Sequence, residues 1–295
     1  MSGQPSLTRC KLMDWENLVA TAVARYTAAA LTDRGRKRAS NEDAFGYSIE
    51  HGVYLVCDGM GGAAAGEIAS SLAIEEVLRH ITGRRESANA EADNPESGIR
   101  EDASSIPQIA HEAVTLANEA IHSRGQRNQR LTGMGTTLVG LLTARPELAA
   151  QPEDDRRIWI FHVGDSRCYR LRQGSFEQCT HDHSFVEEQI RLGRMTREEA
   201  ARSPWRNVIT RVLGTQPSVT PDVIEIEVEP GDLFLLCSDG LTHEISDQEI
   251  ESVLNTSAST GPDAAPLEEL CSRLIQAANK AGGSDNITCI LVRVD

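Results

Sequence analysis

Aromatic residues are scarce in this chain of 295 residues, since Phe, Trp and Tyr together make up only 4% of it. Apolar residues still reach 40%, so a sizeable core has to be filled mainly by Leu, Ile, Val and Ala. No stretch approaches the roughly 20 apolar residues of a membrane span, and the N-terminus lacks the apolar segment of a signal peptide. We therefore expect a cytoplasmic protein without a membrane segment, built as one large domain.

Positive charge is also in short supply. The chain has 29 Lys and Arg residues against 44 Asp and Glu residues, which gives a net charge of −15. A chain with this charge repels DNA, RNA and anionic lipid at long range, so a role in nucleic-acid binding is not expected. Part of the acidity could instead serve as metal ligands, whose negative charge bound cations would offset.

Paired cysteines are missing as well. The seven cysteines are an odd number and form no CxxC motif, and Cys57, Cys237 and Cys289 lie inside apolar runs. This pattern favours reduced, buried cysteines in a cytosolic protein over a disulfide framework. Motifs of covalent catalysis are absent too: there is no GxSxG elbow, CxxxxxR loop, Walker loop or HExxH motif.

Four aspartates stand where a strand-like run gives way to glycine or another small polar residue: Asp58, Asp165, Asp239 and Asp285. Each of them alone would be an ordinary turn-forming or capping carboxylate. Together they suggest another arrangement, because several carboxylates aimed at one point repel each other unless cations lie between them. Hard, oxygen-liganded ions such as Mg²⁺ or Mn²⁺ bind in this way, which predicts hydrolysis at a metal cluster.

The run DGMGG at 58–62 is the most suggestive of these turns. Its glycines remove side chains and let backbone carbonyls approach a ligand, so Asp58 could bridge two cations while the Gly59 carbonyl binds one. The alternative is a glycine-rich turn with an exposed aspartate.

Glu42 and Asp43 add two more carboxylates, although they could equally lie on a solvated loop. Arg38, four residues before Glu42, is suited to anchoring a phosphate, because a guanidinium can donate two parallel hydrogen bonds. It could also belong to an ordinary basic surface loop. His181 and His183 could bind a metal, but a surface or supporting role is favoured, since a hard-cation site has little use for imidazole. His162 is interpreted as a strand residue near the carboxylates.

Apolar periodicity predicts short strands, a few long helices and polar loops. Strands are expected at 22–31, 44–49, 53–57, 136–143, 158–163, 168–172, 176–178, 223–228, 233–238 and 287–294. Helices are expected at 66–81, 106–123 and 267–281 and near Ile250, the charged segment 181–206 should be largely helical, and capping boxes fall at 196–199 and 246–249. The polar stretches 84–105 and 146–155 are expected to be loops, the first of them mobile. Because strands follow strands, an α+β sandwich is favoured over a doubly wound βαβ sheet.

Six stretches in order resemble the metal-dependent protein phosphatases of type 2C, and within them the bacterial serine/threonine phosphatases. They are RASNED at 38–43, DGMGG at 58–62 with GE at 66–67, GMGTT at 133–137, VGDSR at 163–167, SDGL at 238–241 and DNIT at 285–288. The resemblance implies a four-layer α-β-β-α sandwich of two antiparallel sheets flanked by helices. It also implies a single type 2C domain at 21–295 with a flap at 181–206, while residues 1–20 fall outside the resemblance and are expected to be a polar lead-in.

The resemblance assigns Asp58 as the bridge of a two-metal centre of Mn²⁺ or Mg²⁺, with the Gly59 carbonyl on one ion and Asp239 and Asp285 on the other. It makes Asp165 a ligand of a possible third, weaker ion.

It further implies that Glu42 and Asp43 act through water and that Arg38 binds the phosphate. The implied reaction is in-line attack of a metal-bridging hydroxide on phosphoserine or phosphothreonine, without a phosphoenzyme. Met60 stands where some eukaryotic members carry a suspected acid histidine, so the leaving group's proton has to come from elsewhere.

The expected partners are phosphorylated proteins, the substrates of a serine/threonine kinase, and the expected oligomeric state is a monomer. Two alternatives remain open: a pseudophosphatase that binds phosphoproteins without turnover, and a hydrolase of small phosphate esters.

Overall fold

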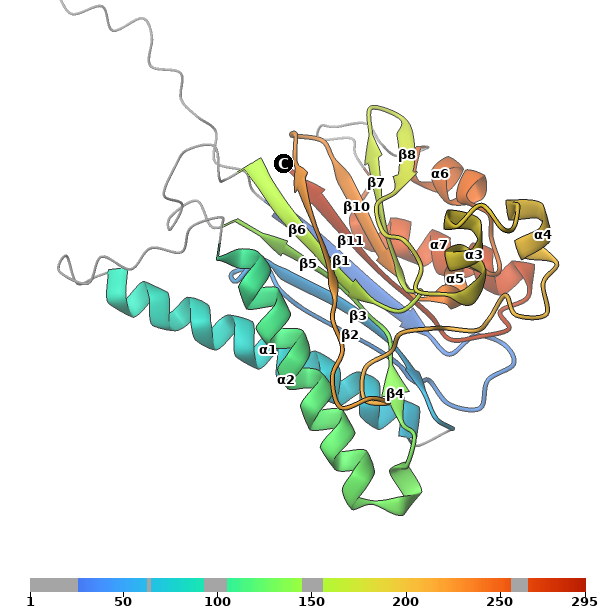
Figure 1. The fold of residues 1–295 in the computed structure, drawn as a ribbon. Coiled ribbons are helices and arrows are strands. Elements are labelled where there is room, and N and C mark those ends of the chain that lie inside the picture. The colour runs from blue at the N-terminus through green and yellow to red at the C-terminus, as the bar shows by residue number, and fades with distance from the viewer. Residues whose placement is uncertain (1–25, 63–64, 93–104, 145–155, 256–264) are drawn as a thin grey trace, which may run out of the picture.

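Two antiparallel β-sheets lie face to face, and helices cover their outer surfaces (Figure 1). The computed structural model describes residues 26–62, 65–92, 105–144, 156–255 and 265–295. The first sheet has five strands in the order β1 (Tyr26–Asp33), β11 (Ile287–Val294), β10 (Leu233–Cys237), β7 (Arg167–Arg172) and β8 (Ser175–Gln178). The second has the order β2 (Asp43–Ser48), β3 (Val53–Met60), β5 (Leu138–Thr143), β6 (Arg157–Val163) and β9 (Asp222–Glu227), and β4 (Gly135–Thr136) pairs with β3.

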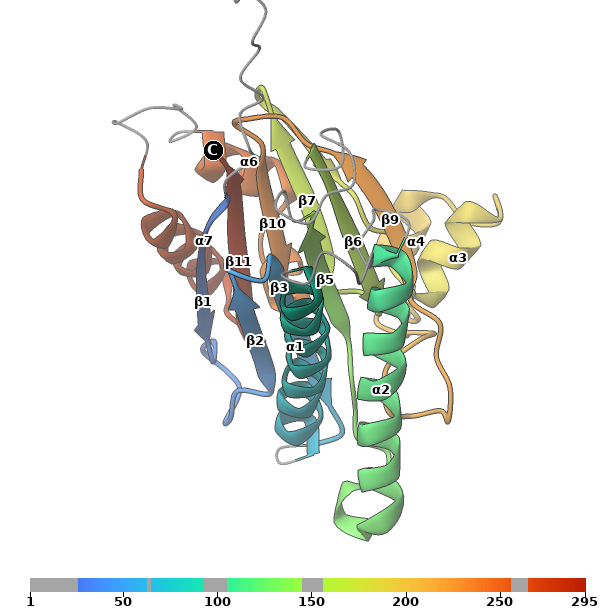
Figure 2. The same ribbon diagram turned by 90° about the vertical axis from the view of Figure 1, so that its left-hand side faces the viewer.

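The helices form the two outer layers. Helices α1 (Ala65–Ala92) and α2 (Ile106–Arg127) pack on the second sheet, and Figure 2 shows them side by side. Helices α5 (Asp239–Thr242), α6 (Asp247–Asn255) and α7 (Leu267–Ala281) lie on the side of the first sheet. Two short helices, α3 (Phe185–Arg191) and α4 (Arg197–Ala201), project beside the ends of the sheets, and a 3₁₀ turn, η1 (Gln129–Leu131), follows α2. The expected four-layer α-β-β-α sandwich is confirmed.

Strict side-chain alternation explains why the central strands read as continuous apolar runs. In β3, Val53, Leu55 and Cys57 face the core under α1 and α2, whereas Tyr54 and Val56 face the core between the sheets. Neighbouring residues of a strand point to opposite faces, so a strand covered on both sides has to be apolar at every position. Helix α7 has a different periodicity, because its buried residues recur every three to four positions, as in an amphipathic helix.

Several predicted elements are confirmed closely and one prediction was wrong. Helix α7 and strand β11 occupy the expected residues, and both capping boxes form. The expected loop at 84–105 is helical as far as Ala92, and its remainder up to residue 104 lies outside the described residues. The physical reason is Arg85, whose buried guanidinium donates to the carbonyls of His51 and Thr143 and so holds a polar stretch of helix against the sheet.

Smaller differences concern other predicted segments. The first strand begins at Tyr26, and residues 22–25 of the prediction lie outside the described part, as do the lead-in at 1–20 and the whole loop at 146–155. Segment 181–206 is less helical than expected, because it holds only the short helices α3 and α4. None of the cysteines in the described ranges forms a disulfide. Across the same residues, no helix combines the length and the apolar composition needed to cross a bilayer.

Candidate metal centre

The carboxylates singled out in the sequence come from strand ends of both sheets. Asp58 lies near the end of β3, directly opposite Asp43 of β2 in the strand register. Asp165 follows β6, and Asp239 follows β10 at the start of α5. Asp285 precedes β11. The fold thus gathers side chains that are up to 242 positions apart in the sequence, from Asp43 to Asp285.

Asp43 is the least exposed of these side chains. Its Oδ2 atom accepts hydrogen bonds from Ser238 Oγ and Thr288 Oγ1, both at 2.7 Å, while Oδ1 is buried without a partner among the described residues. Burial raises the pKa of Asp43 to about 7 against the opposing effect of the two hydrogen bonds, and the negative charges of Asp239 and Asp285 add to the rise. A carboxylate in this setting gains from a nearby cation.

Asp58 is fixed by its backbone. Its N–H donates to Thr137 Oγ1 at 2.9 Å, and its carbonyl accepts from Thr136 Oγ1 at 2.8 Å and from the Thr137 N–H at 2.9 Å. Burial raises the pKa of Asp58 well above its usual range, and the charges of Asp43, Asp239 and Asp165 add to this. The backbone bonds therefore hold in place a side chain that its neighbours repel.

Asp165 and Asp239 complete a group of mutually repelling carboxylates. Burial raises the pKa of Asp165 to about 7, with the charge of Asp239 as the next cause. In each of the two residues, Oδ1 is buried and has no hydrogen-bond partner in the described part of the chain. Buried carboxylate oxygens without hydrogen-bond partners are the donors that Mg²⁺ and Mn²⁺ prefer, so these residues fit such ions.

Close backbone packing accounts for the glycines around Asp58. The Gly59 N–H donates to the Glu42 carbonyl at 3.2 Å. A Cβ atom on Gly59 would lie 2.2 Å from the Gly66 carbonyl oxygen, and one on Gly66 would lie 2.0 Å from Glu42 Oε2. Glycine at both positions therefore lets the turn pack against the segment that carries Glu42.

Arg38 lies at the exposed edge of this group. Its Nη2 atom donates to Asp285 Oδ2 at 2.5 Å, and about half of the side chain, 51%, is exposed. The charges of Asp58 and Glu42 also act on the guanidinium. The structure thus brings Arg38 together with the acidic residues and leaves one side of its guanidinium open to solvent.

Sequence reasoning missed the polar residues that hold these carboxylates. Ser238 and Thr288 bind Asp43, Thr137 binds Asp58, and the Asn286 side chain accepts from the Glu42 N–H at 2.8 Å. Each of them stands next to or inside a motif, but a hydroxyl in a strand has no periodic signal that reveals its partner. Only the pairing of strands from both sheets shows what it contacts.

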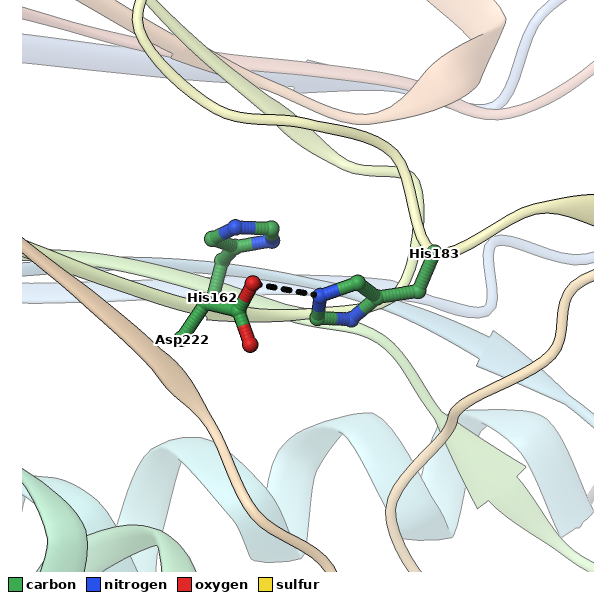
Figure 3. A group of neighbouring side chains, drawn as sticks. All are labelled: His162, His183 and Asp222. Carbon is green, nitrogen blue, oxygen red and sulfur yellow. Dashed lines mark ion pairs between the residues drawn. The ribbon is translucent and has the colours of Figure 1, made fainter. Parts of the chain in front are cut away.

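A second group, His162, His183 and Asp222, has donor atoms within 4.8 Å of one another (Figure 3). The two rings are stacked, with centroids 4.5 Å apart and planes at 19°. Imidazole lone pairs lie in the ring plane, so two stacked rings aim poorly at one ion. His183 Nδ1 accepts from the Gly164 N–H at 3.1 Å, which leaves the proton of the neutral ring on Nε2, 3.3 Å from Asp222 Oδ2. We interpret this group as a buried support behind the Asp165 turn, as the sequence suggested for His162.

Residues 32–291 match the family described as protein phosphatase 2C. The serine/threonine phosphatase stp of Listeria welshimeri is 34% identical over 264 residues, which are 88% of this chain and 93% of that protein. The serine/threonine protein phosphatase PstP of Mycobacterium tuberculosis is 38% identical over 276 residues. That match covers 93% of this chain, which spans 46% of the length of PstP.

Solved structures show the same relationship. The catalytic domain of PstP in complex with two manganese ions has a TM-score of 0.71 at 34% identity, covering 92% of this chain and 99% of that one. The S. agalactiae serine/threonine phosphatase has a TM-score of 0.73 at 33% identity, covering 92% of this chain and 100% of that one.

Proposed function

Because this chain belongs to the protein phosphatase 2C family, we propose that it hydrolyses phosphoserine and phosphothreonine in proteins, with Mn²⁺ or Mg²⁺ as cofactor. One observation carries the proposal most directly. Asp43, Asp58, Asp165 and Asp239 come from both sheets, their charges raise the pKa of Asp43, Asp58 and Asp165, and Asp43, Asp165 and Asp239 each keep a buried oxygen without a partner among the described residues. Such a group is costly unless cations bind to it.

We assign the ligands as the family resemblance suggests. Asp58 would contribute to holding both ions, the Gly59 carbonyl would hold one of them, and Asp239 and Asp285 would hold the other. Asp165, together with Asp239, supports a third and weaker ion. When bound, paired divalent cations lower the pKa of water and supply a nucleophile near neutral pH.

Two further acidic residues act indirectly. Glu42 and Asp43 would hold the ions through water molecules. The position of Asp43 supports this role, because Ser238 and Thr288 occupy one of its oxygens and leave the other free.

Arg38 orients the phosphoryl group. Its guanidinium is half-exposed and bonded through one nitrogen to Asp285, so further N–H groups remain for phosphoryl oxygens. The negative charge that develops on those oxygens during the reaction is stabilised by the same guanidinium.

Hydrolysis without a phosphoenzyme is supported by the surroundings of Ser238. Its hydroxyl donates to Asp43 and accepts from the Thr288 N–H at 3.0 Å, so its proton and one of its two lone pairs are already engaged. Direct attack of water on phosphorus remains as the simplest route.

The wider setting follows from the same assignment. We propose that phosphorylated proteins made by a serine/threonine kinase are the substrates, and that the protein acts as a cytoplasmic monomer without binding membranes or nucleic acid. We also propose residues 21–295 as one catalytic domain, with 181–206 as a flap beside the site and 1–20 as a polar lead-in.

The test is phosphate release from a phosphothreonine peptide, measured with Mn²⁺ and then with excess EDTA. We expect release that requires Mn²⁺ and is lost in Asp58→Asn. Asp295→Asn, the same chemical change at the exposed end of β11, should behave as wild type. Peptide binding without release under any divalent metal would contradict the proposal and favour a phosphoprotein-binding role. Faster release from nucleotides than from phosphopeptides would favour a small-ester hydrolase.

A further inference from the structure

A pocket of about 410 Å³ lies between the carboxylates and segment 181–206. Asp165 and Asp239 line it on the side of the sheets, and Ile190, Arg197, Ala200 and Arg206 line it on the side of the segment. The pocket therefore begins at two of the proposed metal ligands and continues to a wall that has arginines at its edge.

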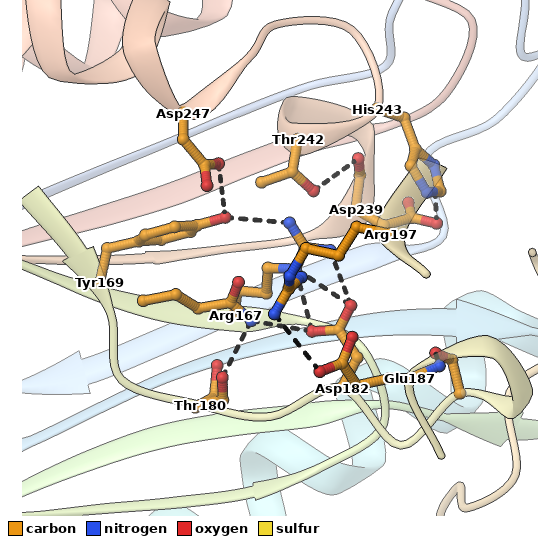
Figure 4. Close-up of polar contacts among 12 residues, drawn as sticks. Arg167, Tyr169, Thr180, Asp182, Glu187, Arg197, Asp239, Thr242, His243 and Asp247 are labelled. Atoms are coloured by element: carbon orange, nitrogen blue, oxygen red, sulfur yellow. Dashed lines mark hydrogen bonds and ion pairs between the residues drawn. The ribbon is translucent and has the colours of Figure 1, made fainter. Parts of the chain in front are cut away.

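The start of segment 181–206 is held by Arg167, whose three nitrogens each donate hydrogen bonds within the protein. Arg167 donates to Asp182 from Nε at 2.9 Å and from Nη2 at 2.7 Å, and its Nη1 donates to Tyr169 Oη at 3.0 Å (Figure 4). Tyr169 in turn donates to Asp247 at 3.0 Å. This network fixes the start of segment 181–206 against the first sheet, and three of the five N–H groups of Arg167 are already bonded within it.

Arg197 and Arg206 differ from Arg167 in this respect. Arg197 is 77% exposed, and its only ion pair in the described residues is a long one of 3.8 Å to Glu187 (Figure 4). The Arg206 side chain lines the pocket and has no ion pair or hydrogen bond with any residue that the structure describes. Two guanidinium groups are therefore available at the pocket in a chain whose net charge is −15.

The pocket also offers apolar surface below these charges. Val186, Ile190, Ala200 and Ala201 belong to its lining. A short aliphatic stem that ends in a negative charge matches this combination, because the stem packs on the apolar residues while the charge meets the arginines. A basic side chain would meet two like charges instead, and the carboxylates of the lining are paired with arginines, as Asp182 and Glu187 are, or belong to the proposed centre.

We propose that this pocket binds a glutamate or aspartate side chain of the substrate, located within a few residues of the phosphorylated serine or threonine. The inference rests on the proposed function, since Asp165 and Asp239 of the proposed centre also line this pocket. Arg197 and Arg206 are then specificity-determining residues. Nothing else in the described part of the pocket supplies positive charge that is not already paired.

The experiment compares phosphothreonine peptides that differ only by Glu or Gln, placed in turn at each of the three positions on either side of the phosphothreonine. We expect wild type to prefer the Glu peptide at one or two positions, by about 5-fold in kcat/KM for each arginine engaged, the upper range for a partly exposed ion pair. The preference should shrink as salt is raised. Equal kcat/KM for Glu and Gln at every position would overturn the inference.

Variants test whether the arginines cause the preference. Arg206→Gln and Arg197→Gln should each reduce the ratio of kcat/KM for the Glu peptide to kcat/KM for the Gln peptide. Arg206→Glu should reverse the charge preference, so that a peptide with Lys at that position has a higher kcat/KM than the Glu peptide. Arg202→Gln is the matched control, because Arg202 is an exposed arginine of the same segment that does not line the pocket, and it should leave the ratio unchanged. An equal loss of preference in Arg202→Gln would mean that the overall charge of the segment, and not the pocket, is responsible.

A small aryl phosphate separates failure of this inference from failure of the proposed function. If wild type hydrolyses the aryl phosphate and the phosphopeptides with Mn²⁺ but shows no acidic preference, only the pocket assignment is wrong. If it hydrolyses none of them, the proposed function itself fails.

Discussion

Replacing His162 by Phe should make the protein more resistant to mild acid. His162 is 1% exposed in β6, and neither ring nitrogen has a hydrogen-bond partner among the described residues. Phe has a similar size and can still stack on His183, so the change removes a titrating group without breaking a hydrogen bond. Removal of an unsatisfied buried polar group is close to neutral or stabilising.

The magnitude follows from the pKa of His162, which burial lowers to about 4, with the positive charge of His183 as the next cause. The unfolded chain has a pKa near 6.5 at this position, so it takes up a proton at a pH where the folded protein does not. Stability is therefore fully present above about pH 6.5 and is lost as the pH falls towards 4. Over the whole window the loss is about 3 kcal/mol, and between pH 7.5 and 5.5 it is about 1 kcal/mol.

The assay is urea unfolding followed by circular dichroism at pH 7.5 and 5.5, with EDTA present so that cations do not contribute. The lower pH stays above the isoelectric point near 5.0, where solubility is least. The loss of unfolding free energy between the two pH values should be about 1 kcal/mol smaller in His162→Phe than in wild type. His111→Phe, at an exposed position of α2, is the control. Equal losses in His162→Phe and wild type would refute the argument that His162 stays neutral in the fold.

Two further changes test the proposed centre. Arg38→Ala should raise KM for phosphopeptides about tenfold. This is the lower end of the effect expected for a lost charged hydrogen bond, because Arg38 is half-exposed. An unchanged KM would mean that another group anchors the phosphate. Gly66→Ala should weaken Mn²⁺ binding about tenfold or more, because its Cβ would displace Glu42. Calorimetric titration with Mn²⁺ checks this, and Gly83→Ala, where a Cβ meets nothing within 4 Å, should bind as wild type does. Equal Mn²⁺ affinities in the two variants would mean that Glu42 does not contribute to the metal centre.

Local patterns in the sequence predicted those parts of the fold in which one physical effect dominates. Helix α7 combines an apolar stripe with a glycine at its end, and β11 is apolar on both faces, so each was located at its observed residues. Composition did not predict the structure at Arg85, because a charged residue in a polar stretch indicated a loop. Its carbonyl partners come from the turn between β2 and β3 and from the end of β5. Such partners become visible only when the tertiary structure is known.

The candidate site divides in the same way. The aspartates at strand ends could be found because each one interrupts an apolar run next to a glycine or a small polar residue. Their hydroxyl partners could not, since Ser238 and Thr288 reach Asp43 across 195 and 245 positions. The pocket arginines gave no signal either, because in the sequence Arg197 and Arg206 look like other charged residues of an exposed segment.

The hydrogen bonds of Asp43 have a mechanical consequence. Asp43 begins an edge strand of one sheet, and both of its partners belong to the other sheet or follow directly from it. The sheets therefore cannot slide or separate at this end without pulling a carboxylate out of the cation site. Cation binding and sheet alignment form one equilibrium, in which bound ions raise the stability of the sandwich.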